Sequence, residues 1–172
     1  KSTMERQLLA ISPKARLLSV DYGKNPKDYQ AAPIKITFRY EIPDYALRGE
    51  GEMFFRPMVM NNLYNQVRSY IWIDTSVENR KDGFKDGCSR LVELDETIQL
   101  PAGYKLVSAA KDETMQGVGA DFEGSLVQKG NKVLLHNRLA LKKRVYEASD
   151  WESFRNAVNA HKAYGEYLVI KK

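Results

Sequence analysis

The 172-residue chain has few of the side chains from which most catalytic and metal sites are built. It contains one cysteine, Cys88, and two histidines, His136 and His161. A single cysteine excludes an internal disulfide, and these three residues lie too far apart in the sequence for the ligand spacing of a zinc site. The sequence also lacks a phosphate-binding loop and a dinucleotide-binding fingerprint. We therefore expect no metal and no cofactor.

A cysteine hydrolase is an alternative that has to be weighed. Cys88 lies in DGCSR and is followed by the strand-like RLVEL, whereas a reactive thiol is commonly placed at a helix N-terminus, which lowers its pKa. His136 falls on the polar side of a predicted strand, and His161 falls on the core-facing side of a predicted helix. We expect one surface imidazole and one packing imidazole, and hence no cysteine–histidine catalytic pair.

Residues 82–93 partly match a calcium-binding loop. Asp82, Asp86, Gly87 and Glu93 occupy positions one, five, six and twelve of such a loop. Phe84 stands where a third oxygen ligand belongs, and no helical pattern flanks the segment. The pattern therefore favours a Gly–Asp turn, not a calcium site.

The chain also lacks a long apolar run and a strong excess of one charge. No segment has the length and apolarity of a transmembrane helix, and 27 Lys and Arg oppose 22 Asp and Glu, for a net charge of +5. The basic run KKR at residues 142–144 has no second basic cluster with interleaved aromatic residues, so it favours a solvated strand end and no nucleic-acid partner. The first residue is Lys1 and not Met, which we interpret as a fragment of a longer protein.

Period-two alternation of apolar and polar residues dominates the sequence and predicts strands. Residues 121–128 and 132–141 flank Lys-Gly-Asn, which predicts a hairpin. Residues 53–60 are β-prone, but Pro57 removes a ladder donor, so we expect an edge strand or a bulge there. The other predicted strands are residues 34–42, 91–100 and 104–107.

Helical patterns are confined to the two ends of the chain. Residues 2–11 begin with an S-x-x-E capping box and predict a short helix. Residues 150–164 predict an amphipathic helix, since Trp151, Phe154, Val158 and His161 share one face. A second S-x-x-E box, at Ser149, would cap it. The prediction is a mainly β fold, with residues 1–12 as a helical remnant of an upstream region and residues 13–172 as one β-sandwich domain. This domain includes the helix at 150–164 and a last strand at 166–171.

Two stretches resemble a known family. They read LPAGYKL (100–106) and VLLHNRLALKKRVYEASDWESFRNAVNAHKAYGEYLVIKK (133–172), with F-R-x-x-x-x-A and L-V-x-K-K in the second. They resemble the C-terminal domain of unknown function that follows a transglutaminase-like domain in many bacterial proteins, notably of the Bacteroidetes. YEIPDYA (40–46) and FFRPMVMN (54–61) fit the resemblance loosely. RKDGFKDGCSR replaces the Pro-Val-Asp-Phe-like segment that is typical of such domains.

The resemblance implies an immunoglobulin-like antiparallel sandwich that is non-catalytic and exported to the periplasm or cell surface. The catalytic Cys, His and Asp of such proteins belong to the upstream domain, and none of them maps onto this chain. The implied function is an accessory domain that packs against or positions the upstream transglutaminase-like domain, or binds a partner. The alternative is a stand-alone module that binds carbohydrate or protein. Its candidate contact surface is Tyr64, Tyr70 and Trp72, which the intervening isoleucines also make compatible with a core.

Overall fold

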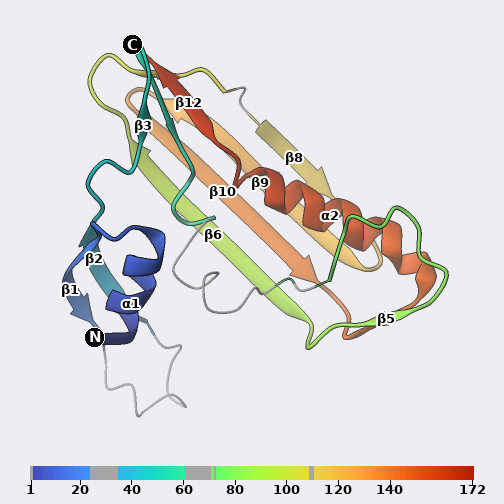
Figure 1. Cartoon of the computed structure of the whole chain (residues 1–172). Helices are drawn as coiled ribbons and strands as arrows, with labels where there is room; N and C mark the ends of the chain where they lie inside the picture. Colours follow the sequence, from blue (N-terminus) through green and yellow to red (C-terminus); the bar gives the residue numbers. More distant parts are fainter. Residues whose placement is uncertain (1, 24–34, 61–70, 72, 109–110) are drawn as a thin grey trace. The chain divides into compact units, whose positions relative to one another are not determined.

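A computed structural model describes residues 2–23, 35–60, 71, 73–108 and 111–172 (Figure 1). The chain divides into two compact units, one with the described residues up to Tyr45 and one with those from Ala46 onward. The boundary expected after residue 12 stays a prediction, and residues beyond it pack with the N-terminal helix.

The first unit is a helix packed on a strand pair. The predicted helix is confirmed as α1 (Ser2–Ile11), and β1 (Arg16–Asp21) pairs with β2 (Thr37–Glu41) in antiparallel fashion. Leu8 and Ala15 are buried, and five apolar residues pack against them. These are Ile11, Leu17, Phe38, Tyr40 and Ile42. The helix thus has its apolar contacts within this unit.

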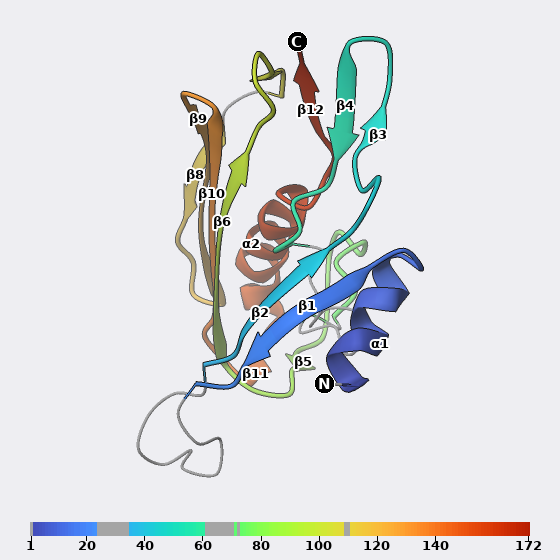
Figure 2. The same ribbon diagram turned by 90° about the vertical axis from the view of Figure 1, so that its left-hand side faces the viewer.

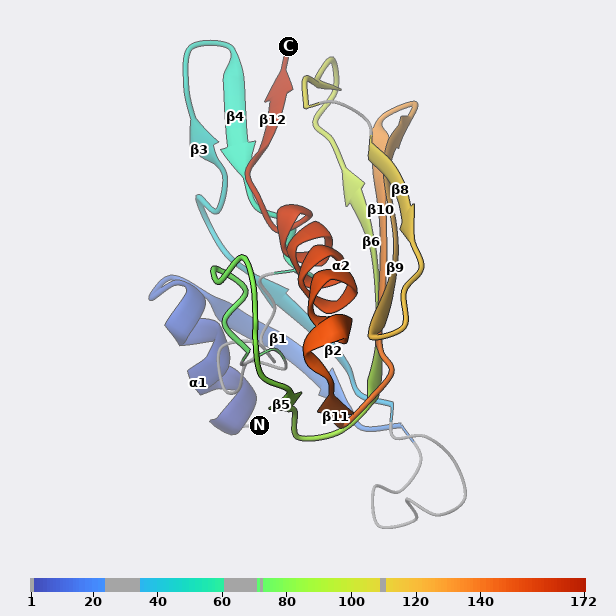
Figure 3. The same ribbon diagram turned by 90° about the vertical axis from the view of Figure 1, so that its right-hand side faces the viewer.

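The second unit contains two four-stranded sheets, and every strand pair in them is antiparallel. The first sheet has the order β6 (Arg90–Gln99), β10 (Lys132–Leu141), β9 (Ala120–Lys129), β8 (Lys111–Met115). The second has the order β3 (Leu47–Arg48), β4 (Glu52–Phe55), β12 (Leu168–Lys171), β7 (Lys105–Leu106). Helix α2 (Trp151–Ala163) and the strands β4 and β12 lie on the same side of the first sheet (Figures 2 and 3). A mainly β, antiparallel, sandwich-like fold with a C-terminal helix is confirmed.

The β9–β10 hairpin follows the predicted pattern. Its register runs from Lys132↔Lys129 to Leu141↔Ala120, and Gly130 turns the chain with a φ of 62°. Positive φ strains residues that carry a Cβ, so glycine suits this position. Alternate residues of β10 point into the core and are buried, namely Val133, Leu135, Asn137, Leu139 and Leu141.

Two local predictions near Pro57 and Ser149 are wrong. Strand β4 ends at Phe55, so Pro57 removes no ladder bond, and β4 lies inside its sheet and not at an edge. The capping box forms between Glu147 and Asp150, at the start of a 3-10 turn (Ala148–Asp150) that precedes α2. In this box the Asp150 carboxylate accepts a hydrogen bond from the Glu147 N–H at 2.9 Å.

An aromatic cluster joins α2 to a small strand pair formed by β5 (Phe84–Lys85) and β11 (Val145–Tyr146). Phe84 stacks on Tyr146 with ring centroids 4.6 Å apart, and Phe154 meets both rings at 5.0 Å. Trp151 packs edge-on against Phe84 (5.2 Å), and the guanidinium of Arg80 lies over the Trp151 ring (4.5 Å). These contacts bury the helix face that the sequence pattern predicts.

Gly124 on β9 makes room for the aromatic ring of Tyr164. A Cβ at this position would lie 2.5 Å from Cζ of Phe122 and 2.7 Å from Cζ of Tyr164. Gly124→Ala should therefore destabilise the fold by about 1–3 kcal/mol, the usual cost of overpacking. Urea unfolding would measure it, with Gly49→Ala as the control, since a Cβ there would meet its nearest neighbour at an ordinary 3.5 Å. Equal stability of the two variants would contradict the prediction.

Candidate functional site

The candidate aromatic contact surface lies outside the described part of the chain. Tyr64, Tyr70 and Trp72 all fall in the gaps at residues 61–70 and 72. The binding role expected of these residues therefore stays a prediction.

The two candidate bases lie on opposite sides of the first sheet, and the candidate nucleophile precedes its strand β6. His136 and Asn137 are neighbours on β10 and so face opposite sides of the sheet. His136 lies on the solvent side, 2.8 Å from Asp95, whereas Asn137 points inward and contacts His161 of α2. Cys88 is exposed and precedes β6, whose first residue, Arg90, pairs with Leu141. Asp95, which pairs with His136, lies five residues after Arg90 on β6. At 3.4 Å per residue this separates His136 from the start of β6 by roughly 17 Å along the strand.

The buried pair Asn137–His161 serves packing. Both side chains are at most 1% exposed. Asn137 Oδ1 lies 2.5 Å from His161 Nδ1, and Asn137 Nδ2 donates to the His161 carbonyl at 3.4 Å. Burial, followed by the charge of Lys162, lowers the pKa of His161 from 6.5 to about 4. The imidazole is therefore neutral at pH 7 and links α2 to β10, in agreement with the expected packing role.

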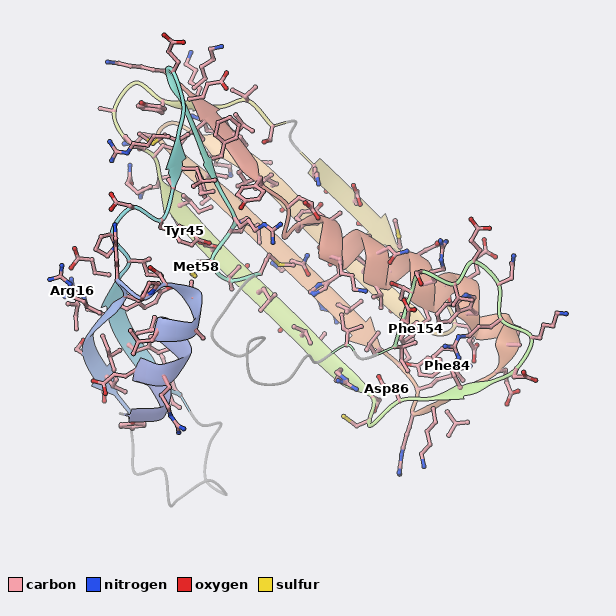
Figure 4. The ribbon with its side chains drawn as sticks, in the orientation of Figure 1. Arg16, Tyr45, Met58, Phe84, Asp86 and Phe154 are labelled. Atoms are coloured by element: carbon pink, nitrogen blue, oxygen red, sulfur yellow. The ribbon has the colours of Figure 1, made fainter. Side chains whose placement is uncertain are left out.

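The carboxylates of the calcium-like segment do not converge. Asp86 is buried and pairs with Arg90 at 2.7 Å, and its Oδ1 also accepts from the Gly87 N–H (Figure 4). Glu93 pairs with Arg138 at 3.1 Å on the solvent side of the first sheet. Among the residues that the structure describes, no group of three or more His, Cys, Asp or Glu side chains could hold a metal ion.

The basic run at residues 142–144 makes specific internal ion pairs. Lys142 Nζ lies 2.7 Å from Asp121 and donates to the Gly117 carbonyl at 2.8 Å. Lys143 Nζ donates to both carboxylate oxygens of the buried Asp150, at 2.7 and 2.8 Å. These hydrogen bonds lower the pKa values of Asp121 and Asp150 below 3.8. The expected strand end is confirmed, and its lysines also fasten the sheet to the start of α2.

Glu96 is a half-buried acid that the strand prediction does not single out. It lies on β6 on the inward side, in the row of Leu94 and Ile98, and its two oxygens accept from the N–H groups of Met58 (3.1 Å) and Val59 (2.9 Å; Figure 4 labels Met58). Burial raises the pKa of Glu96 above 4.5, and the two backbone hydrogen bonds oppose that rise. The sequence signal that could have identified Glu96 is its position in the inward-facing row of the predicted strand. The carboxylate holds residues 58–59 against the sheet.

A hollow of about 530 Å³ lies beside the first turn of α2. Its residues are Met115, Gln116, Gly117, Val118, Ala120, Ser149, Glu152, Ser153 and Asn156. The Gly119 N–H donates to Ser153 Oγ at 3.1 Å, and that hydroxyl donates to the Asp150 carbonyl at 3.0 Å. This lining contains one carboxylate and no histidine, lysine or cysteine, so it offers Ser149 and Ser153 no general base apart from Glu152. The hollow is therefore a weak candidate for catalysis.

Comparison with known proteins places the fold in a family. A family model described as "Domain of Unknown Function with solved-structure structure (DUF3858)" matches residues 51–169. A search of curated proteins finds no significant match. A solved structure described as a "putative protease" from Parabacteroides distasonis is similar with a TM-score of 0.50 and 13% identity, over 57% of this chain and 20% of that one. This likeness concerns the fold alone, and the matched part of our chain corresponds to about a fifth of the longer protein.

No helix in the described residues is long and apolar enough to cross a membrane. The family match covers more than half of the sequence and includes the whole first sheet, α2, and β4, β7 and the start of β12 in the second sheet. The chain belongs to the DUF3858 family of domains.

Proposed function

We propose that this chain is a non-catalytic accessory domain of a larger, exported, transglutaminase-like bacterial protein. In this role it packs against the catalytic domain or positions it. The observation that carries the proposal is the placement of Cys88, His136 and His161: the first is exposed before β6, and the two imidazoles lie on opposite sides of the first sheet. Nucleophilic catalysis by cysteine needs a base within hydrogen-bond reach of the thiol.

Two further observations support an accessory role. The polar side chains of the second unit are engaged in holding its elements together, as Lys142, Lys143 and Glu96 illustrate. The similar fold from Parabacteroides distasonis makes up only a fifth of its chain, so such a domain occurs within a longer protein. The sequence motifs at residues 100–106 and 133–172 carry the transglutaminase-like association and the periplasmic or cell-surface location.

The test compares the 172-residue chain with the longer gene product. The chain alone should neither hydrolyse fluorescent casein nor incorporate an amine into it, and Cys88→Ala should change nothing. The longer product should lose stability or activity when this domain is deleted. Casein hydrolysis by the chain alone that Cys88→Ala abolishes would overturn the proposal, as would a gene product with no further domain.

A further inference from the structure

The second sheet carries an apolar row on its outer surface that crosses β3, β4 and β12 and ends just after β7. Leu47 pairs with Phe54, and Phe54 pairs with Val169. Val107 follows β7 and donates its N–H to the Val169 carbonyl at 2.8 Å, which continues the row. Leu47 is 59% exposed and Val107 is 56% exposed. The intervening residues Phe55, Leu168 and Ile170 are buried on the opposite surface. We call these four residues, Leu47, Phe54, Val169 and Val107, the apolar row.

Basic side chains border the apolar row on both sides. On one side Lys171 pairs with Glu52 at 3.1 Å and stands in register with Lys105 of β7. On the other side the Arg56 guanidinium lies 4.6 Å from the ring centroid of Tyr167, which is 48% exposed. Three cations and one carboxylate therefore surround the row, so the outer surface of this sheet is positively charged.

The first sheet provides an internal comparison. On its solvent side Arg138 stands in register between Glu93 and Glu123, and His136 stands between Asp95 and Ser125. These are the polar rows that suit a sheet surface in water. The apolar row of the second sheet departs from this pattern within the same unit. Contiguous exposed apolar surface with a polar rim is typical of an interaction site.

Charge decides which occupant fits. A second copy docking by the same surface would bring Arg56, Lys105 and Lys171 against their own equivalents, which is unfavourable. An anionic lipid surface would suit the charge, but the row lies in the middle of a sheet face, and the β3–β4 tip that projects beyond it is Gly49-Glu50-Gly51. The remaining occupant is a folded protein surface with an apolar strip and carboxylates at its edges.

We infer that the apolar row docks onto such a surface of a neighbouring domain in the same polypeptide. The inference rests on the proposed function, because that function supplies the neighbouring domain. The likeness to one fifth of a longer chain agrees with a fold that has covalently linked neighbours. The apolar row gives the contact its buried centre, and Arg56, Lys105 and Lys171 give it orientation.

Leu47→Glu in the longer gene product is the test, with Leu91→Glu as its matched control. Leu91 is 52% exposed and lies on the solvent side of the first sheet, so the two variants differ in surface and not in burial. Leu47→Glu should raise the rate of limited proteolysis between the domains about tenfold, the factor for a loss of ~1.4 kcal/mol of docking. Leu91→Glu should leave the rate unchanged. In the 172-residue chain both variants should keep the parent melting temperature.

Four results would overturn the inference. Equal proteolysis of the two variants would exclude docking by the apolar row, yet would leave the proposed accessory role intact. A dimer of the 172-residue chain, seen by light scattering and dissociated only by Leu47→Glu, would assign the row to self-association. Co-sedimentation with phosphatidylglycerol vesicles that only Leu47→Glu abolishes would assign it to a membrane. A gene product with no second domain would refute the proposed function first, and this inference with it.

Discussion

Phe154→Ala should lower the free energy of unfolding by about 3–5 kcal/mol, the usual cost of removing a buried aromatic ring. Phe154 is fully buried and contacts Phe84 and Tyr146 at ring-centroid distances of 5.0 Å and Trp151 at 5.9 Å. Its removal leaves a cavity where α2, β5 and β11 meet. Since β5 and β11 pair through only two residues each, they have little else to hold them.

Urea unfolding measures the loss, and hydrogen exchange locates it at β5 and β11. Val118→Ala is the control, because Val118 is 70% exposed and should change stability by less than about 0.5 kcal/mol. If Phe154→Ala does not fold, Phe154→Leu keeps much of the volume and should give a smaller cost of about 1–2 kcal/mol. A cost below about 1 kcal/mol for the alanine variant would mean that the cluster does not hold these elements together.

Lowering the pH from 7 to 4 should destabilise the protein by about 3 kcal/mol through His161 alone. The pKa of this imidazole is about 4 in the folded protein and near 6.5 when the chain is unfolded. Between these values the unfolded state binds the proton and the folded state does not, so stability falls as the pH falls. The loss begins below pH 6.5 and is complete near pH 4.

Asp150 and Glu96 also affect the pH dependence of stability, but in another pH range or in the opposite direction. The pKa of Asp150 lies below 3.8 because of its hydrogen bonds to Lys143, so its contribution is lost only below that pH. Burial raises the pKa of Glu96, so its protonation on acidification favours the folded state. Comparison of the parent protein with His161→Gln cancels both terms and isolates the histidine.

The difference in unfolding free energy between pH 7 and pH 4.5 is the quantity to measure. It should shrink in His161→Gln and persist in His136→Gln, whose imidazole lies on the solvent side beside Asp95. NMR of the parent protein gives a second readout that does not depend on the folding of a variant. The ring protons of His161 should keep constant chemical shifts from pH 7.5 to 5.5, and a titration in that range would refute the prediction.

The elements that sequence patterns predict well are those whose partners are close in sequence. The β9–β10 hairpin needs only its own alternation and the Gly130 turn, and α2 shows its buried face through Trp151, Phe154 and Val158. Strand β7 falls within the predicted strand at residues 104–107, but the two-residue strands β5 and β11 carry no such pattern, because pairing between these distant segments creates them. Propensity over two residues is overridden by tertiary contacts.

The side-chain contacts of the candidate site residues were predicted less completely than the strands and helices, because many of these contacts also join distant parts of the sequence. The two histidines were placed on the correct surfaces, because strand parity and helix period determine which way each side chain points. The partners of Lys142 and Lys143 could not be read from the sequence, since Asp121 belongs to another strand and Asp150 to the turn before α2. Asn137 and Glu96 are polar residues at inward-facing strand positions, and both make internal hydrogen bonds. A polar residue at such a position therefore indicates a specific internal partner.

The place of β12 inside the second sheet has a consequence for synthesis on the ribosome. β4 and β7 both pair with β12, which is the last of this sheet's four strands to be synthesised. The ion pair between Glu52 and Lys171 joins residues that are 119 positions apart in the chain. Only the β3–β4 pairing of this sheet can form before β12 has been synthesised. Such long-range closure is slow, and it leaves strand edges unpaired meanwhile. Nascent chains stalled before residue 168 should therefore expose β4 and bind chaperones that recognise extended apolar segments.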